Sequence, residues 1–133
     1  AVEIYEAANA GEAYTCFLRA DQALPMMYMD DAVRATLELM RVPANQIRVR
    51  TSYNLGAMSF TPSEVAKSIQ QYLPNFQVHY QPDHRQGIAE SWPESIEDTA
   101  AQADWGWKPK VLLPEMTKTM LLAIEKKTQT AVH

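Results

Sequence analysis

The segment YNLGAMSFTPSEV, residues 53–65, carries the strongest structural signals in the chain. An apolar run reaches Gly56, continues briefly, and then meets a helix start signal. Thr61 can cap this helix through its hydroxyl, Pro62 has the φ value of a first helical position, and Glu64 can bond back to the cap N–H. The segment therefore predicts a strand, a glycine turn, a short strand and a helix in direct succession.

The predicted helix has one apolar face and a defined end. Its apolar residues recur at i, i+1, i+4, i+7 and i+8, the spacing of a single buried face. Pro74 ends the helix because the residue before a proline avoids the αR conformation. The residues expected to face the core are Val65, Ala66, Ile69, Tyr72 and Leu73.

Before this segment, the pattern predicts alternating helices and strands. We expect a helix over 2–10 that ends at Gly11, strands over 13–18 and 24–29, and a strand with one wet face over 47–51. Between the last two strands, a helix capped by Asp30 or Asp31 is expected to turn an apolar stripe toward the core. That stripe consists of Val33, Leu37 and Met40.

After Pro74, the pattern predicts further short elements and a long last helix. We expect a strand over 76–80, an extended segment over 81–91, and a short helix over 96–103 with capping residues Ser95 and Asp98. The turn over 105–107 is expected to place Trp105 and Trp107 in the core. A helix from Pro114 should bury Met116, Met120, Ala123 and Ile124, and 128–133 is expected to be a frayed tail.

Composition excludes several classes of protein. The chain has 133 residues, of which 47% are hydrophobic and 21% charged, values typical of a globular protein. A net charge of −4 argues against nucleic acid as a partner, since phosphate binding requires a basic face. One cysteine, Cys16, precludes an intrachain disulfide, and no apolar run approaches the ~20 residues that span a membrane. We expect a cytoplasmic protein, or one of the mitochondrial matrix in a eukaryote.

Four motifs together resemble one enzyme family. They are Tyr53-Asn54-x-Gly56 with its following helix, LPMMYMDD at 24–31, QGIAESWP at 86–93 and DWGWKP at 104–109. In this order they resemble the carboxy-terminal part of the short-chain type of NAD-dependent L-threonine 3-dehydrogenase, an extended short-chain dehydrogenase/reductase (SDR) related to nucleotide-sugar epimerases. The similarity runs over about 1–124. It implies an α/β fold in which 1–127 form the substrate-side lobe plus the last strands of a Rossmann-type sheet.

The resemblance also implies that part of the enzyme lies upstream. A dinucleotide site needs closely spaced glycines, and no two of the four glycines form a G-x-G pair. The family's catalytic tyrosine has a lysine four residues later, but none of the six tyrosines here is followed by lysine at that spacing. We therefore expect no catalytic or cofactor-binding residue in this chain, with NAD bound only by the complete enzyme. The chain alone should be inactive and should self-associate as a homodimer.

Three residues are candidates for contact with substrate. Trp92, between an extended segment and a helix cap, has no periodicity that would bury it, so we expect it to meet ligand. Arg85 resembles the diphosphate-gripping arginine of the epimerases, although the spacing is one residue short, and an ion pair within the fold is the simpler interpretation. Met26 belongs to a methionine cluster that suits either a core or an adaptable pocket. No metal site is expected, because His79 and His84 have only Asp83 nearby.

The function implied by the resemblance is oxidation of L-threonine to 2-amino-3-oxobutyrate. An epimerase or dehydratase acting on a nucleotide sugar is the first alternative. Leu24 and Ile88 argue against it, because they stand where those enzymes carry an arginine and an acid. The second alternative is a stand-alone binding module without catalysis.

Overall fold

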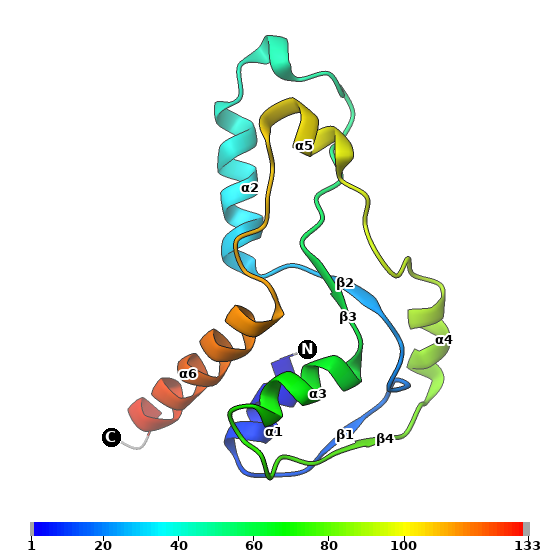
Figure 1. Ribbon diagram of the computed structural model, residues 1–133, viewed down its shortest axis with the longest axis vertical. Helices are drawn as coiled ribbons and strands as arrows, with labels where there is room; N and C mark the ends of the chain where they lie inside the picture. Colours follow the sequence, from blue (N-terminus) through cyan, green and yellow to red (C-terminus); the bar gives the residue numbers. More distant parts are fainter. Residues whose placement is uncertain (1, 132–133) are drawn as a thin grey trace.

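A computed structural model describes residues 2–131 of the chain (Figure 1). The helices are α1 (Val2–Asn9), α2 (Met29–Arg41), α3 (Pro62–Gln70), α4 (His84–Glu90), α5 (Thr99–Trp105) and α6 (Leu113–Ala131), with a 3₁₀ turn η1 (Ala44–Gln46). The strands are β1 (Tyr14–Cys16), β2 (Leu24–Met26), β3 (Met58–Phe60) and β4 (Val78–Tyr80). The predicted α/β class is confirmed.

The strands form two small sheets. β1 pairs in parallel with β4, so that Tyr14 lies opposite Val78. β2 pairs antiparallel with β3, so that Leu24 lies opposite Phe60. Each pair joins segments distant in sequence, and the helices supply the apolar surfaces that cover the strands.

The main core lies where α1, α3 and α6 meet the strands, in the lower half of Figure 1. Three buried hydroxyl groups link these helices: Thr117 Oγ1 lies 3.2 Å from Tyr5 Oη and accepts a hydrogen bond from Ser68 at 2.8 Å. These polar side chains satisfy one another, so their burial is not destabilising. The buried apolar residues of this core are Ile4, Tyr5, Ala8, Phe60, Val65, Ile69, Phe76, Met116 and Leu121.

A second, smaller core lies between α2 and α5, in the upper half of Figure 1. Ala35, Ala101 and Trp107 are fully buried there. The guanidinium of Arg34 lies 4.6 Å from the centre of the Trp107 ring, a cation–π contact. The expected core position of Trp107 is therefore confirmed, whereas Trp105 is only half-buried and packs edge-on against Tyr53.

The start of α3 confirms the strongest local prediction. The Thr61 side chain accepts a hydrogen bond from the Glu64 N–H, and the Glu64 carboxylate accepts one from the Thr61 N–H at 2.8 Å. Val65, Ala66 and Ile69 are buried as expected. Tyr72 lies beyond the end of the helix and is exposed.

The prediction for α2 was wrong in two respects. The helix begins at Met29, neither aspartate caps it, and the buried Asp31 instead accepts hydrogen bonds from the N–H groups of Lys110 and Val111. The stripe of Val33, Leu37 and Met40 faces solvent, because Asp31, Arg34 and Ala35 occupy the inner face of the helix.

Two loop predictions were also wrong. The segment 47–51 forms no strand, since the N–H groups of Arg48 and Val49 donate to the Tyr53 hydroxyl and not to a neighbouring strand. The segment expected to be extended contains α4, which Asp83 caps by accepting a hydrogen bond from the Arg85 N–H.

The last helix is longer than expected. α6 continues through the first part of the expected tail to Ala131, and the Thr128 hydroxyl donates to the Ile124 carbonyl one turn earlier. Met116 is buried and Ile124 half-buried, but Ala123 is exposed, and Leu121 takes the inward position. Val132 and His133, the end of the expected tail, lie outside the described residues.

Candidate functional site

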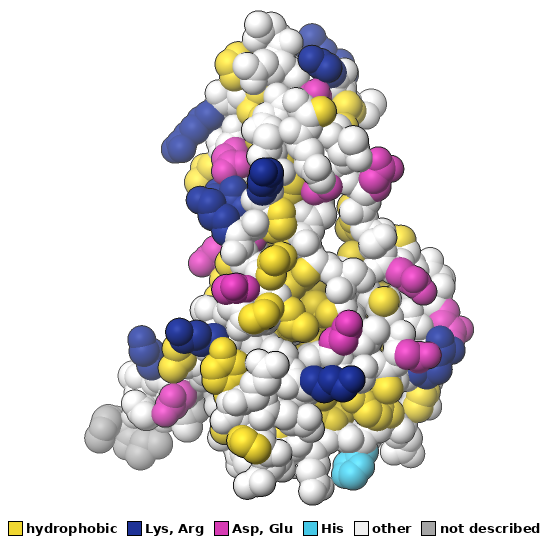
Figure 2. All heavy atoms as spheres, in the orientation of Figure 1, with side chains coloured by type: hydrophobic (Ala, Val, Ile, Leu, Met, Phe, Trp, Pro, Cys, Tyr) yellow, Lys and Arg dark blue, Asp and Glu magenta, His cyan; other side chains and the backbone are white. Residues whose placement is uncertain are grey.

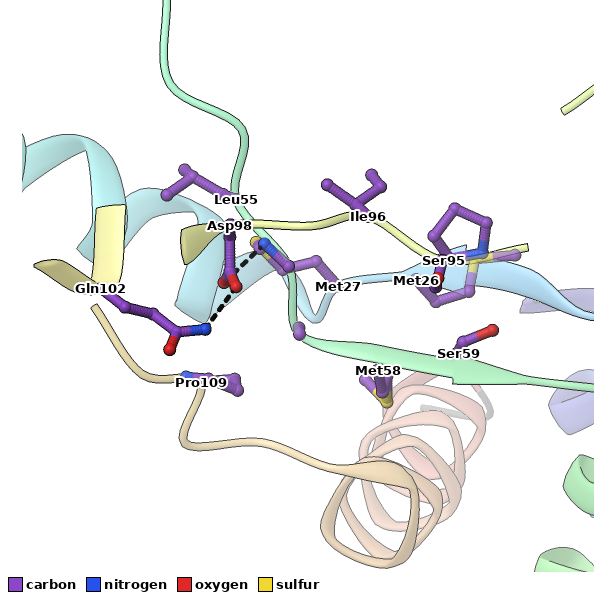
Figure 3. Close-up of a pocket in the computed structure, with 13 residues that line it drawn as sticks. Met26, Met27, Leu55, Met58, Ser59, Ser95, Ile96, Asp98, Gln102 and Pro109 are labelled. Atoms are coloured by element: carbon purple, nitrogen blue, oxygen red, sulfur yellow. Dashed lines mark hydrogen bonds between the residues drawn. The ribbon is translucent and has the colours of Figure 1, made fainter. Parts of the chain in front are cut away.

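A hollow of about 300 Å³ lies beside the β2–β3 pair (Figure 3). Met26 and Met27 come from the end of β2, Met58 and Ser59 from β3, and the opposite wall comes from the segment that leads into α5. Most labelled side chains are apolar, with Asp98 and Gln102 at one end and Ser59 and Ser95 at the other. Figure 2 shows hydrophobic side chains gathered near the middle of the molecule, between the upper and lower halves of Figure 1. Further lining residues are Pro25, Leu55, Gly56, Ala57, Ile96 and Pro109.

Gly56 fixes the wall of this hollow. Its N–H donates to Asp98 Oδ2 at 3.0 Å, and its carbonyl accepts a hydrogen bond from the Trp107 indole at 2.9 Å. A Cβ at this position would lie 2.8 Å from the Ile96 carbonyl oxygen. The glycine is therefore required for close approach of two backbone segments, and Asp98 acts as an anchor between them.

A second, smaller cavity of about 80 Å³ also lies beside the β2–β3 pair and is lined by Leu24, Met26 and Phe60 of these strands. Met26 lines both spaces and so forms part of the wall between them. Tyr14 also lines this cavity, and burial is the main cause that raises the pKa of its hydroxyl to about 12. The other lining residues are Ile4, Cys16, Phe17, Leu18, Gln22, Pro62 and Val65.

Arg85 lies next to this cavity but outside its lining. Its guanidinium stacks 3.5 Å from the centre of the Phe17 ring and forms an ion pair with Asp83 at 2.6 Å. Hydrogen bonds from Arg85 hold the pKa of Asp83 at about 2. Met26 and Phe17 both line this cavity, and Arg85 reaches it only through its contact with Phe17.

Trp92 follows α4, and 58% of its surface is exposed. The helix before it is attached to the body through Gln86, a buried residue that the sequence analysis did not single out. The Gln86 amide oxygen accepts from the Arg19 N–H at 2.8 Å, and its nitrogen donates to Gln22 and Glu90. Gln86 begins the QGIAESWP motif, but nothing in that motif indicated its role, because its role depends on a loop distant in sequence.

The glycines of this chain do not form a dinucleotide-binding loop. Gly11 and Gly106 have positive φ values and follow the ends of α1 and α5, Gly87 lies inside α4, and Gly56 packs against Ile96. None of them opens a helix after a strand, which is the position that brings pyrophosphate to a helix N-terminus.

Two kinds of feature are absent from residues 2–131. No cluster of three His, Cys, Asp or Glu side chains there could hold a metal ion. No helix in this range is long and apolar enough to cross a membrane.

The arrangement of strands and helices is similar to that of the carboxy-terminal part of extended SDR enzymes. No protein-family model matches the chain. The chain is 48% identical over 122 residues to the mitochondrial L-threonine 3-dehydrogenase of Bos taurus. This match covers 91% of this chain and 32% of the relative. It is also 48% identical over 128 residues to a Staphylococcus aureus protein described as an uncharacterized epimerase/dehydratase; this match covers 96% of this chain and 40% of the relative.

Solved structures show the same similarity. A GalE-like L-threonine dehydrogenase from Cupriavidus necator is 55% identical with a TM-score of 0.88, over 91% of this chain and 44% of that one. The L-threonine dehydrogenase of Phytophthora infestans is 46% identical with a TM-score of 0.90, over 94% and 40%. UDP-glucose 4-epimerase of Thermotoga maritima, at 23% identity and a TM-score of 0.73 over 97% and 39%, shares the fold. The chain thus spans about a third to less than half of the proteins it resembles.

Proposed function

We propose that this chain forms the substrate-side part of an NAD-dependent L-threonine 3-dehydrogenase, which oxidises L-threonine to 2-amino-3-oxobutyrate. The observation that carries the proposal is identity of 48–55% to L-threonine dehydrogenases over about 91% of the chain. The part of the enzyme that this chain does not span supplies the NAD site and the catalytic tyrosine and lysine. NAD accepts the hydride there.

The chemistry of the cavity walls supports a small substrate over a nucleotide sugar. A diphosphate requires a cationic partner, and Arg and Lys are absent from the described lining of both spaces beside the β2–β3 pair. Leu24 lines the smaller cavity where the epimerases place an arginine. Arg85, the nearest candidate cation, is already paired with Asp83.

Three side chains have proposed roles in binding threonine. The exposed indole of Trp92 offers an apolar face for the threonine methyl group and an N–H for its carboxylate. Met26 forms an adaptable wall between the two spaces. Arg85 supports Phe17 from outside, and a contact between its guanidinium and substrate is the less favoured role because of the Asp83 pair.

A chimeric enzyme tests this proposal. The chain replaces the matching carboxy-terminal part of the Cupriavidus necator enzyme, and reduction of NAD is followed by absorbance. We expect the chimera to reduce NAD in the presence of threonine and the isolated chain to reduce none. A folded chimera that has lost threonine oxidation would contradict the proposal, and conversion of UDP-glucose by that chimera would favour the epimerase alternative.

A further inference from the structure

Helix α2 has its polar and apolar faces reversed relative to the body of the molecule. Its inner face contains Asp31 and Ala35, which are 2% and 0% exposed. Arg34, on the same side, donates to the Lys108 carbonyl at 2.6 Å. An ordinary surface helix buries its apolar stripe and exposes its charges, so this orientation requires an explanation.

The outer face of α2 consists of Met29, Val33, Leu37 and Met40, which are 70%, 53%, 45% and 76% exposed. At about 100° per residue these four side chains lie within roughly 80° of one another, almost opposite Asp31 and Ala35. In Figure 1, α2 lies at the margin of the upper half, with α5 on its inner side. A continuous apolar stripe of this kind marks an interaction surface.

We propose that the outer face of α2 is the docking surface for the amino-terminal, NAD-binding part of the dehydrogenase. This inference rests on the proposed function. The relatives are more than twice as long as this chain, which covers 32% of the cattle enzyme and 44% of the Cupriavidus necator chain. The remainder of such an enzyme must bury apolar surface of its own, and the outer face of α2 is an apolar stripe available to it.

The size of the face favours this occupant over a second copy. A stable complex between separate molecules buries about 800 Å² on each partner, contributed by roughly 20–30 residues. Four side chains on one helix fall far short of that number. A contact within one enzyme chain can be much smaller, because the covalent connection gives the two surfaces a high effective concentration.

Oxidation of methionine by dilute hydrogen peroxide, measured by mass spectrometry, tests the inference. The isolated chain and the chimera are compared at concentrations where light scattering shows monomers. We expect Met29 and Met40 to oxidise quickly in the isolated chain and at least tenfold more slowly in the chimera. Met116, which is 7% exposed, is the internal reference and should be slow in both.

The outcomes separate the inference from the proposed function. Equal oxidation of Met29 and Met40 in both proteins would overturn the docking surface, even in a chimera that oxidises threonine. Protection in a chimera without threonine oxidation would support the docking surface and contradict the proposed function. Protection that appears only when the protein dimerises would assign the face to a second copy, and a chimera that stays insoluble would also count against the fit.

Discussion

Replacing Gly56 by alanine should destabilise the chain more than any other single methyl addition at a glycine. The new Cβ would lie 2.8 Å from the Ile96 carbonyl oxygen and 3.2 Å from Asp98 Oδ2. The nearest contact is with a backbone oxygen of Ile96, which cannot move as a side chain can. Asp98 is held by its hydrogen bonds with Gly56 and Gln102. The clash can be relieved only by moving two segments apart.

The expected cost follows from the contacts that such a movement breaks. Forcing an extra methyl into a packed site costs about 1–3 kcal/mol. Lengthening the bond to the Asp98 carboxylate and the bond from the Trp107 indole costs about 1 kcal/mol each or more. Alanine lowers the conformational entropy of the unfolded chain, which offsets about 0.4–1 kcal/mol of this cost. We therefore expect the free energy of unfolding to fall by about 3 kcal/mol.

Urea unfolding followed by tryptophan fluorescence measures this change, because Trp107 is fully buried beside Gly56 and becomes exposed on unfolding. Gly87→Ala is the matched control: Gly87 lies inside α4 and a Cβ there meets nothing within 4 Å. Since alanine is the better helix former, Gly87→Ala should stabilise by up to about 1 kcal/mol. An ordinary surface substitution changes the free energy of unfolding by about 0.5 kcal/mol or less. A change of that size for Gly56→Ala would refute the reasoning.

Three further predictions concern the other parts of the structure. Burial alone would raise the pKa of Asp31, but hydrogen bonds from Val111, Arg34 and Lys110 outweigh it and hold the pKa below its ordinary value of 3.8. The ionised Asp31 therefore stabilises the folded chain above about pH 4, and this contribution is lost on acidification. In urea unfolding, Asp31→Asn should cost about 2 kcal/mol at neutral pH and flatten this acid dependence, whereas Asp30→Asn should do neither. The isolated chain should self-associate in light scattering as its concentration rises, and Val33→Glu with Leu37→Glu should reduce that association without lowering the melting temperature, because both side chains are exposed. In the chimera, Trp92→Ala should weaken threonine binding by about 2–4 kcal/mol and leave NAD affinity unchanged. Unchanged kinetic constants for threonine together with a lowered melting temperature would indicate that Trp92 has a structural role instead.

Local signals in the sequence predicted local structure well. The capping box of Thr61 and Glu64 and the turn at Gly106 depend on residues within one helical turn, and both are present. The helix α4 was missed even though Asp83 is a good capping residue, because the mixed polar residues of 81–91 together with Gly87 favoured an extended segment. The error shows that a cap can outweigh an internal glycine when the helix is anchored elsewhere.

Contacts between distant segments could not be predicted in the same way. Asp98 was expected only as a helix cap, yet its carboxylate accepts the Gly56 N–H across 42 positions of sequence. Asp31 was expected to cap its own helix and instead holds Lys110 and Val111. A carboxylate next to a helix start satisfies the capping pattern whether it bonds locally or across the fold, so the pattern cannot separate these roles.

The apolar stripe of α2 shows a related limit of sequence-based prediction. It also indicates which contacts of α2 are made within this chain and which remain for the rest of the proposed enzyme. Periodicity identified Val33 and Leu37 as residues that need burial, but it could not say which body buries them. Inside this chain, Asp31 and Arg34 fix α2 by hydrogen bonds with the backbone of Lys108, Lys110 and Val111, which leaves the apolar side free. Polar contacts therefore orient the helix within the substrate side, and apolar contacts remain for the NAD-binding side. On this reasoning, Asp31→Asn should loosen α2 in the isolated chain, whereas changes at Val33 should leave the fold of the isolated chain intact and weaken the contact with the NAD-binding part.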